Sequence, residues 1–237
     1  MIKKNQNRLK VNPKVKEQQN VINKKLQNPK IKEKLQKVLN LPKHRFEFYV
    51  KERNYNDYNH TFKKLLNNKS IVDFIKTRFK SKNISILDEG AGKTIFLRDI
   101  KKLLMKEGID SHTTAITLSK EVTRKNTDVD LLVKLKTQEY LLNRKYDLIF
   151  SVFGGIHYNI FELNKNVVLK LAHSLSEKGV MFIGVNRFTY SEKFTLEQIV
   201  KNISKTLNKN GFDLKFSYVP HNIHYKLPVF IFKIERK

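Results

Sequence analysis

From residue 84 onward the chain alternates short apolar segments with amphipathic ones, and this order constrains the fold more than any other feature. Short apolar runs are typical of buried strands, whereas apolar residues at helical spacing are typical of helices packed on a sheet. Repeated strand–helix units predict a mostly parallel sheet with helices on both faces, because parallel neighbours need a crossover connection. The predicted strands are 84–87, 115–118, 129–133, 146–152, 180–185, 212–219 and 229–234, and the predicted helices among them are 95–106, 164–175 and 194–207.

Seven strands in this order predict an α/β fold with a doubly wound sheet, in which the last two strands are adjacent and antiparallel. Ligands of such sheets bind beyond the carboxyl ends of the strands, at the point where the strand order reverses. Ahead of the first strand, residues 46–60 are aromatic and polar, and residues 62–79 show the apolar spacing of one or two helices.

The first 45 residues differ from the rest in charge. They carry 14 basic and 2 acidic residues, a net +12 of the chain's +26. Ile31, Leu35, Val38 and Leu39 share one helical face before Pro42 ends the pattern. We therefore expect a basic, partly helical N-terminal extension at 1–45 and a single domain at 46–237. Three interpretations of the extension stay open: an arm that orders on RNA, a solvated segment whose helix packs on the domain, and a mitochondrial presequence, which the Lys-rich composition with few Arg and Ser favours least.

The composition excludes several classes of protein. The 237 residues include no cysteine, which rules out disulfide scaffolds, thiolate metal sites and cysteine nucleophiles. The absence of a long apolar run and of an apolar leader predicts a soluble, cytoplasmic protein. The 39 Lys, 9 Arg and 23 Asn fit either a nucleic-acid partner or an AT-rich genome, since phosphate recognition often favours Arg over Lys.

A glycine-containing turn follows the first strand, in the run Asp88-Glu89-Gly90-Ala91-Gly92-Lys93-Thr94. The GKT string suggests a nucleotide-triphosphate loop, but that motif needs a glycine where Leu87 stands. The dinucleotide pattern GxGxxG fails as well, because Ile95 takes the place of its last glycine. What remains is strand, acid, GxG and helix, in which two glycines allow a tight turn and let a ligand approach the backbone.

Three stretches of the chain, in order, resemble motifs of class I S-adenosylmethionine (SAM)-dependent methyltransferases. ILDEGAG at 86–92 resembles their first motif, YDLIFSV at 146–152 their fourth, and LAHSLSEKGVMFIGV at 171–185 the helix, turn and strand that follow. The resemblance covers about residues 84–235. It implies a Rossmann-like fold, SAM as the cofactor and methyl transfer as the activity.

The resemblance also implies which residues contact the cofactor. Gly90, Ala91 and Gly92 would line its methionine part, and Asp88 would hold its amino group or the turn itself. A role of Asp88 as a helix cap or loop ligand is an alternative compatible with this one. Ser151, in the fourth motif, is also predicted to bind the cofactor.

Two departures from the family pattern concern the nucleoside. The acid that usually ends the second strand is missing, and Thr94 stands where the motif has its third glycine. The TLS string at 117–119 resembles the cyclopropane fatty acid synthase branch, which makes Thr117 and Ser119 our ribose-binding residues. Ser119 is an equally good helix N-cap. Gln138 or Glu139 would stand near the adenine.

The segment after the fourth strand concerns the methyl acceptor. SVFGGIHYNIFE at 151–162 and Lys93 resemble messenger RNA cap guanine methyltransferases, which have GxGKG and QFxxHYxF at these places. Lys93 would face the boundary between cofactor and acceptor. His157 and Tyr158 would line the acceptor pocket as the catalytic residues, with Phe153 in its wall. A flat base needs such an aromatic wall with polar groups at its edge.

The acceptor remains open at this point, with RNA, an RNA cap, a small molecule and a protein all compatible with the motifs. His157 has the alternative of a loop residue without chemistry. The other hypothesis for the whole chain is a catalytically inactive methyltransferase fold that acts as an RNA-binding or assembly factor. His221 and His224 suggest a surface loop rather than a metal site, because no third ligand accompanies them.

Overall fold

A computed structural model gives the structure of the chain. It describes residues 52–237 except 120, 138, 141, 155, 157–160, 187–195 and 220–228. The predicted N-terminal extension at 1–45 lies outside the described residues, so its helix and its role stay predictions. Within the part that the structure describes, no helix has the length and apolar character needed to cross a membrane.

The domain is built on one sheet of seven strands in the order β3-β2-β1-β4-β5-β7-β6. Strands β1 to β5 run parallel, whereas β7 is antiparallel to both β5 and β6. The mostly parallel seven-stranded sheet with an antiparallel final pair is therefore confirmed. The strands are β1 Asn83–Glu89, β2 Asp110–Ile116, β3 Leu131–Val133, β4 Tyr146–Val152, β5 Leu175–Asn186, β6 Phe212–Val219 and β7 Val229–Arg236.

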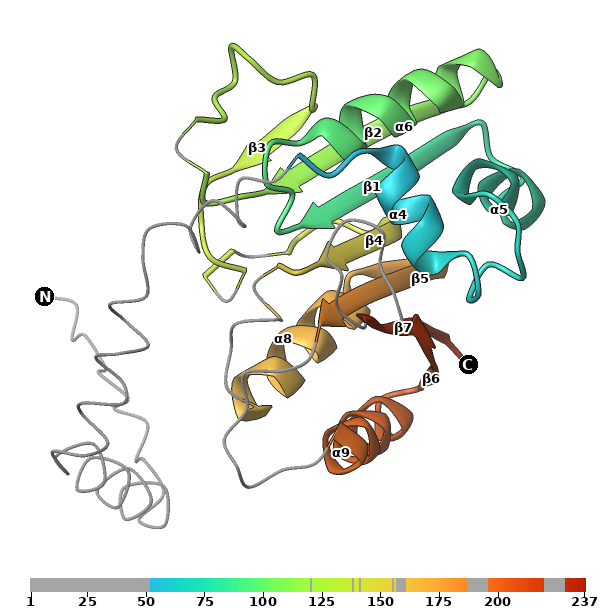
Figure 1. The fold of residues 1–237 in the computed structure, drawn as a ribbon, viewed down its shortest axis with the longest axis vertical. Coiled ribbons are helices and arrows are strands. Elements are labelled where there is room, and N and C mark those ends of the chain that lie inside the picture. The colour runs from blue at the N-terminus through green and yellow to red at the C-terminus, as the bar shows by residue number, and fades with distance from the viewer. Residues whose placement is uncertain are drawn as a thin grey trace, which may run out of the picture. The chain divides into compact units, whose positions relative to one another are not determined.

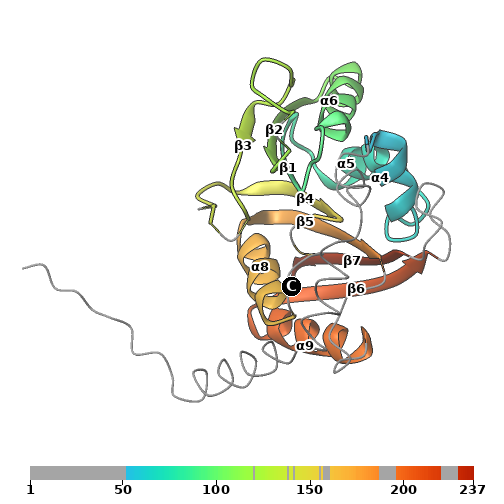
Figure 2. The ribbon, with the colours of Figure 1, turned by 60° about the vertical axis from the view of Figure 1, so that its left-hand side comes forward.

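Helices cover both faces of the sheet, as Figures 1 and 2 show. Three of them lie on one face and share an apolar core with it, and two lie on the other face with a second core. Those on the first face are α4 Tyr55–Phe62, α5 Ile71–Arg78 and α6 Ile95–Lys106, and those on the second are α8 Phe161–His173 and α9 Leu196–Lys209.

Helix α4 comes from the aromatic segment ahead of the first strand. Asn54 caps it by accepting from the Asp57 amide, and the Asp57 carboxylate accepts from the Asn54 amide in return. The helix packs through Tyr58, whose ring stacks on Phe96 of α6 at 3.8 Å between centroids. Phe150 of β4 meets both rings edge-on. Such aromatic pairs add about 1 kcal/mol each beyond the area they bury, which fixes α4 against the start of α6.

Two strands of the structure end at different residues from those that the sequence pattern predicts. The sequence pattern ends β1 at Leu87, but the strand continues to Glu89, so both acids lie within the sheet. β2 ends at Ile116, which leaves Thr117 beyond it. The alternative in which Ser119 caps a helix is wrong for the residues described after it, because 121–130 form turns and coil.

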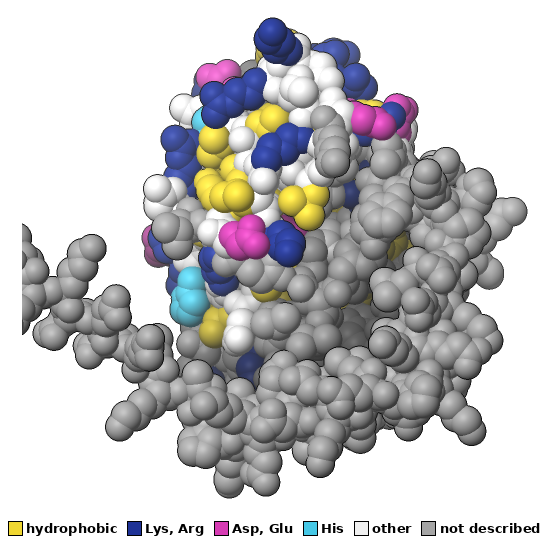
Figure 3. All heavy atoms as spheres, turned by 90° about the vertical axis from the view of Figure 1, so that its left-hand side faces the viewer, with side chains coloured by type: hydrophobic (Ala, Val, Ile, Leu, Met, Phe, Trp, Pro, Cys, Tyr) yellow, Lys and Arg dark blue, Asp and Glu magenta, His cyan; other side chains and the backbone are white. Residues whose placement is uncertain are grey.

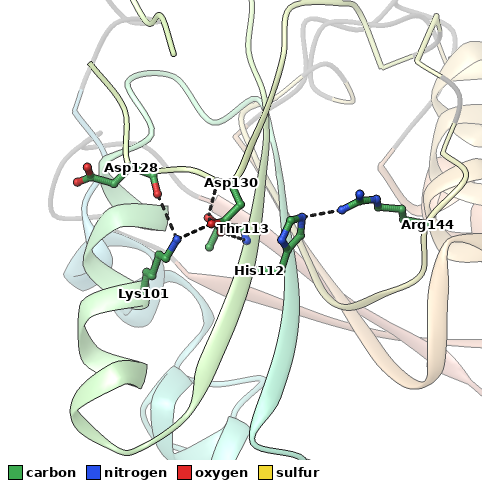
Figure 4. A network of polar contacts seen from close by, with 6 residues as sticks. All are labelled: Lys101, His112, Thr113, Asp128, Asp130 and Arg144. Carbon is green, nitrogen blue, oxygen red and sulfur yellow. Dashed lines mark hydrogen bonds and ion pairs between the residues drawn. The ribbon is translucent and has the colours of Figure 1, made fainter. Parts of the chain in front are cut away.

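A polar network holds the short strand β3 in place (Figure 4). The Asp130 carboxylate, just before β3, accepts from the amide and hydroxyl of Thr113 on β2, at 2.8 Å each, and from Lys101 of α6 at 2.7 Å. Partial burial opposes ionisation of Asp130, but the hydrogen bonds from Lys101 and Thr113 outweigh it and lower its pKa. On the same strand as Thr113, His112 contacts Arg144 at 2.7 Å.

Replacing Asp130 with asparagine is expected to lower the free energy of unfolding by about 1–2 kcal/mol at pH 7, because charge-assisted hydrogen bonds are lost. The folded pKa of Asp130 lies below its unfolded value, so its contribution is present above the unfolded pKa and disappears as the pH falls through the folded one. Urea unfolding at pH 7 and near pH 3 measures this. Asp110→Asn, at an exposed position, is the control; an equal deficit of Asp130→Asn at both pH values would contradict the assignment.

Candidate functional site

The site lies where β1 and β4 are neighbours at the centre of the sheet. The next two strands along the chain, β2 and β3, lie on one side of β1, whereas β4 lies on the other side. The connections that leave β1 and β4 therefore run in opposite directions across the sheet. In open α/β sheets this divergence leaves a crevice at the carboxyl ends of the strands. The glycine turn and the end of β4 therefore meet at the place where such sheets bind their ligands.

The turn after β1 is tied to the end of β2. The amides of Gly90 and Ala91 both donate to the Ile116 carbonyl, at 2.9 and 3.0 Å. The Thr117 hydroxyl donates to the Gly92 carbonyl at 2.9 Å. These bonds hold the turn in one conformation before any ligand arrives, which lowers the entropy cost of binding against it.

Glycine is required at two places where β1 and β4 approach each other. Gly90 has φ +78°, and a Cβ there would lie 2.2 Å from the Cα of Gly154. A Cβ on Gly154 would lie 2.4 Å from the backbone carbonyl oxygen of Glu89 and 2.3 Å from one of its carboxylate oxygens. Because backbone cannot move aside as a flexible side chain can, both positions exclude larger residues.

Two residues other than glycine hold left-handed backbone beside the crevice. Thr94 has φ +65° just before α6, and Phe153 has φ +50° just after β4. Such conformations cost about 1–2 kcal/mol for residues with a Cβ and persist where the surroundings impose them. The hydroxyl of Thr94 lies 2.7 Å from that of Thr127, which ties the start of α6 to the loop before β3. Thr94 thus adopts the backbone conformation that glycine favours, in place of the missing third glycine.

Asp88 is completely buried beneath the turn. Its two carboxylate oxygens accept from the Tyr58 hydroxyl, at 3.1 and 2.9 Å. Burial raises the pKa of Asp88 to about 7, although the Arg53 guanidinium and the Tyr58 hydroxyl oppose the shift and Glu89 adds to it. The carboxyl therefore changes its charge near neutral pH, at the end of β1 just ahead of the turn.

Glu89 is 1% exposed and faces the opposite side of the sheet. One carboxylate oxygen accepts from Thr137 and the other from Ser151 of β4, each at 2.6 Å. These bonds join the ends of β1 and β4 with the segment after β3. Two buried carboxyl groups therefore end β1, one on each face, and each is held by hydroxyl donors.

The Arg53 side chain bridges the ends of β1 and β4. Its guanidinium donates to the carbonyl of Gly90 through Nη2 and to the carbonyl of Val152 through Nη1. Beside it, Lys93 lies 3.5 Å from both Glu52 and Glu121, which are exposed. The residues just before α4 therefore contact both the glycine turn and the end of β4.

Comparisons with known proteins agree with this geometry. No protein-family model and no curated protein matches the sequence. Among solved structures, the plantazolicin methyltransferase BpumL in complex with S-adenosylhomocysteine (SAH) aligns over 90% of this chain and 92% of its own, with a TM-score of 0.51 and 14% identity. SAM-dependent methyltransferases from Clostridium acetobutylicum and Leishmania major align over 77% and 76% of this chain and 98% and 81% of theirs, each with a TM-score of 0.51, at 14% and 16% identity. The chain has the class I methyltransferase fold.

Within this methyltransferase fold, the structure brings together most of the residues predicted to bind the cofactor. Those that meet at the carboxyl ends of β1, β2 and β4 are Asp88, Gly90, Ala91, Gly92, Lys93, Thr117 and Ser151. The hydroxyl groups of two of these residues form hydrogen bonds within the protein. Thr117 bonds the turn itself, and Ser151 bonds Glu89 on the other face.

The remaining predictions on the site divide into three groups. Ser119 donates its amide to the Thr117 hydroxyl at 3.1 Å, which keeps it beside the turn. Glu139 is exposed after β3. His157 and Tyr158, the predicted catalytic residues, lie outside the described residues, as does Gln138. The acceptor side of the site therefore stays a prediction.

Three residues of this site carry no role in the sequence interpretation. Arg53 and Tyr58 stand in the run 53–58, which loosely resembles the Asn- and Arg-containing segment ahead of the first motif in cap methyltransferases, but that resemblance assigns neither residue a role. Glu89 follows Asp88 directly, and two acids in succession at the end of an apolar strand are the signal that identifies it. A buried acid needs donors, and these come from parts of the chain that the sequence alone does not place nearby.

Proposed function

We propose that the protein is a SAM-dependent methyltransferase that binds its cofactor against the turn at 90–92. The observation that carries this proposal is the preformed turn itself, at the switch point of a sheet with the class I methyltransferase strand order. Gly90 and Gly92 hold positive φ there, and hydrogen bonds from the end of β2 fix them. Solved proteins of the same fold hold SAH.

The residues at the site fit the charged groups of this cofactor. The carbonyls of Gly90 and Val152 already accept from a guanidinium, so they suit another nitrogen cation such as the cofactor's ammonium. The Asp88 carboxyl lies beneath them and adds negative potential when ionised. Leu118, 64% exposed just beyond β2, offers apolar surface to a nucleoside.

The chain has a limited role in the chemistry. SAM supplies a methyl group already activated by its sulfonium, so the protein mainly has to align the acceptor with it. The bonds from Ile116 and Thr117 keep the turn fixed for this purpose. An aromatic nitrogen acceptor needs no base. A hydroxyl or amine acceptor needs one, and His157 is the residue that we propose for it.

Binding of the cofactor is tested by isothermal titration calorimetry of the full chain with SAM and with SAH. We expect one site with a dissociation constant in the micromolar range, about −8 kcal/mol of binding free energy. Absence of heat and of any thermal shift at millimolar concentrations of both would contradict the proposal. It would favour the alternative of an inactive fold that serves as a binding or assembly factor.

RNA is a proposed acceptor that rests on the charge of the chain and on the resemblance of Lys93 and residues 151–162 to cap methyltransferases. The net charge of +26 favours phosphate contacts. On the face in Figure 3, however, the described Lys and Arg side chains are scattered among hydrophobic and acidic ones. This face therefore does not single out RNA over a small molecule or a protein.

If residues 1–45 form an RNA-binding arm, deleting them will weaken RNA binding and flatten its dependence on salt. The arm carries +12, and each phosphate contact adds about 0.7–0.9 to the slope of log affinity against log salt. Filter binding of a structured RNA between low and high salt measures both slopes. Equal slopes for the full and shortened chains would rule out this role for the arm.

A further inference from the structure

Glu89 is a buried carboxyl group that the proposed chemistry does not use. It is 1% exposed, and its two oxygens accept from the hydroxyls of Thr137 and Ser151 at 2.6 Å each. Taking a carboxylate out of water is costly, and an apolar residue at the end of this buried strand would need none of these donors. A departure from the apolar pattern at such a place is typical of a residue with a function beyond packing.

The Glu89 carboxylate lies next to the turn at which we propose that the cofactor binds. Glu89 directly precedes Gly90, and Gly154 lies against both of them. A Cβ added to Gly154 would lie 2.3 Å from a carboxylate oxygen of Glu89, and a Cβ added to Gly90 would lie 2.2 Å from the Cα of Gly154. At 1% exposure the Glu89 carboxylate offers a ligand almost no surface to touch, so it can act on a ligand only through its charge. Such a charge is screened less in a buried position than in water.

Asp88 is the other buried carboxyl group at the end of β1, and its charge is weaker near neutral pH. Burial raises the pKa of Asp88 to about 7, against the effect of the Arg53 guanidinium and the Tyr58 hydroxyl. Its charge is therefore only partial at pH 7, and Arg53 offsets part of it. The charge of Glu89 adds to the same rise in pKa, so it acts on a group that faces the other side of the sheet.

We propose that the Glu89 carboxylate makes the site favour the positively charged sulfonium of SAM over the neutral thioether of SAH. This inference rests on the proposed function and makes Glu89 a specificity-determining residue that acts without touching the ligand. The sulfonium joins the amino-acid end of SAM to its nucleoside, so it belongs to the part of the cofactor next to the turn at 90–92. SAH lacks only the methyl group and this charge, so the site holds the product less tightly than the cofactor.

Other charged groups near the turn act on both ligands, and the test has to separate them from Glu89. The described cations there are Arg53, Lys93 and Lys170. All three remain in Glu89→Gln, so they do not distinguish this variant from the unaltered chain. At pH 5.5 Asp88 is mostly protonated, and it stays so in the variant, because Glu89 makes the smallest of the contributions to its pKa.

The test measures the affinity of the full chain for three ligands by calorimetry at pH 5.5. These are SAM, SAH and sinefungin, in which a carbon bearing an ammonium replaces the methyl sulfonium. Glu89→Gln keeps the length of the side chain and an oxygen that accepts from hydroxyls, but it removes the charge. We expect the affinities for SAM and sinefungin to fall at least about fivefold and the affinity for SAH to change less than about twofold.

Glu177→Gln is the matched control, because it makes the same change at an exposed position near the start of β5, at the opposite end of the sheet. An unchanged ratio of SAM to SAH affinity in Glu89→Gln would overturn the inference, as would an equal loss of all three ligands or a loss of SAM without sinefungin. If Glu89→Gln fails to fold, Glu89→Met, of similar length and without charge, gives the same comparison. Absence of SAM and SAH binding by the unaltered chain would instead reject the proposed function, and the inference with it.

Discussion

Replacing Gly92 with aspartate is expected to weaken SAH binding at least about 100-fold, nearly 3 kcal/mol, without unfolding the protein. Gly92 has φ +52°, and its carbonyl is bonded by Thr117 on the side of β2. Gly92 is buried, so an added side chain has to take up space in the crevice, where a carboxylate crowds the proposed cofactor and repels its carboxylate. Aspartate tolerates left-handed backbone better than most residues, so the backbone strain that it adds is about 1 kcal/mol.

Calorimetry with SAH and a thermal melt of the same sample separate the two effects. Gly211→Asp is the matched control, because Gly211 also has positive φ, at +79°, and a Cβ added there would have open space within 4 Å. We expect similar melting temperatures for both variants and SAH binding only by Gly211→Asp. Retained SAH affinity in Gly92→Asp would show that the cofactor does not lie against this turn.

Replacing Asp88 with asparagine is expected to stabilise the protein at pH 8 while weakening SAH binding. Burial raises the pKa of Asp88 to about 7, compared with 3.8 for the ordinary group. Folding therefore favours the protonated form, and the wild-type protein loses stability as the pH rises from about 4 to about 7. A shift of this size corresponds to about 2–4 kcal/mol at pH 8, which asparagine avoids while still accepting from Tyr58.

Urea unfolding at pH 8 and at pH 4.5 measures this difference. We expect the gain of Asp88→Asn to be large at pH 8 and small at pH 4.5, whereas Asp213→Asn, at an exposed position of β6, changes little at either. Destabilisation of Asp88→Asn by the same amount at both pH values would contradict the raised pKa. A carboxyl group kept at this cost is typical of functional sites.

The sequence predicts the elements best where apolar residues follow one period without interruption. The predicted bounds of β4, β6 and α6 are those of the structure. The predicted β1 is too short because two acids normally end a buried strand. They continue it here because Tyr58, Thr137 and Ser151 donate to them from 30, 48 and 62 residues away, and such distant partners leave no local pattern.

The sequence likewise identifies some residues of the candidate site and misses others. The glycine turn is local, so its residues could be identified from the GxG motif and its place after a strand. The role of Arg53 depends on two carbonyls, one of them 99 residues away, and backbone acceptors are invisible in a sequence. Thr94 shows a further limit, since a threonine adopts the left-handed conformation for which the motif normally has glycine.

A crystal structure of the full chain with SAH tests the central claim most directly. We predict that its amino-acid end lies against the turn at 90–92, with the ammonium on the carbonyls of Gly90 and Val152 and the nucleoside beyond the end of β2. SAH bound elsewhere on the protein, or a crevice between β1 and β4 filled by side chains at saturating SAH, would contradict the account.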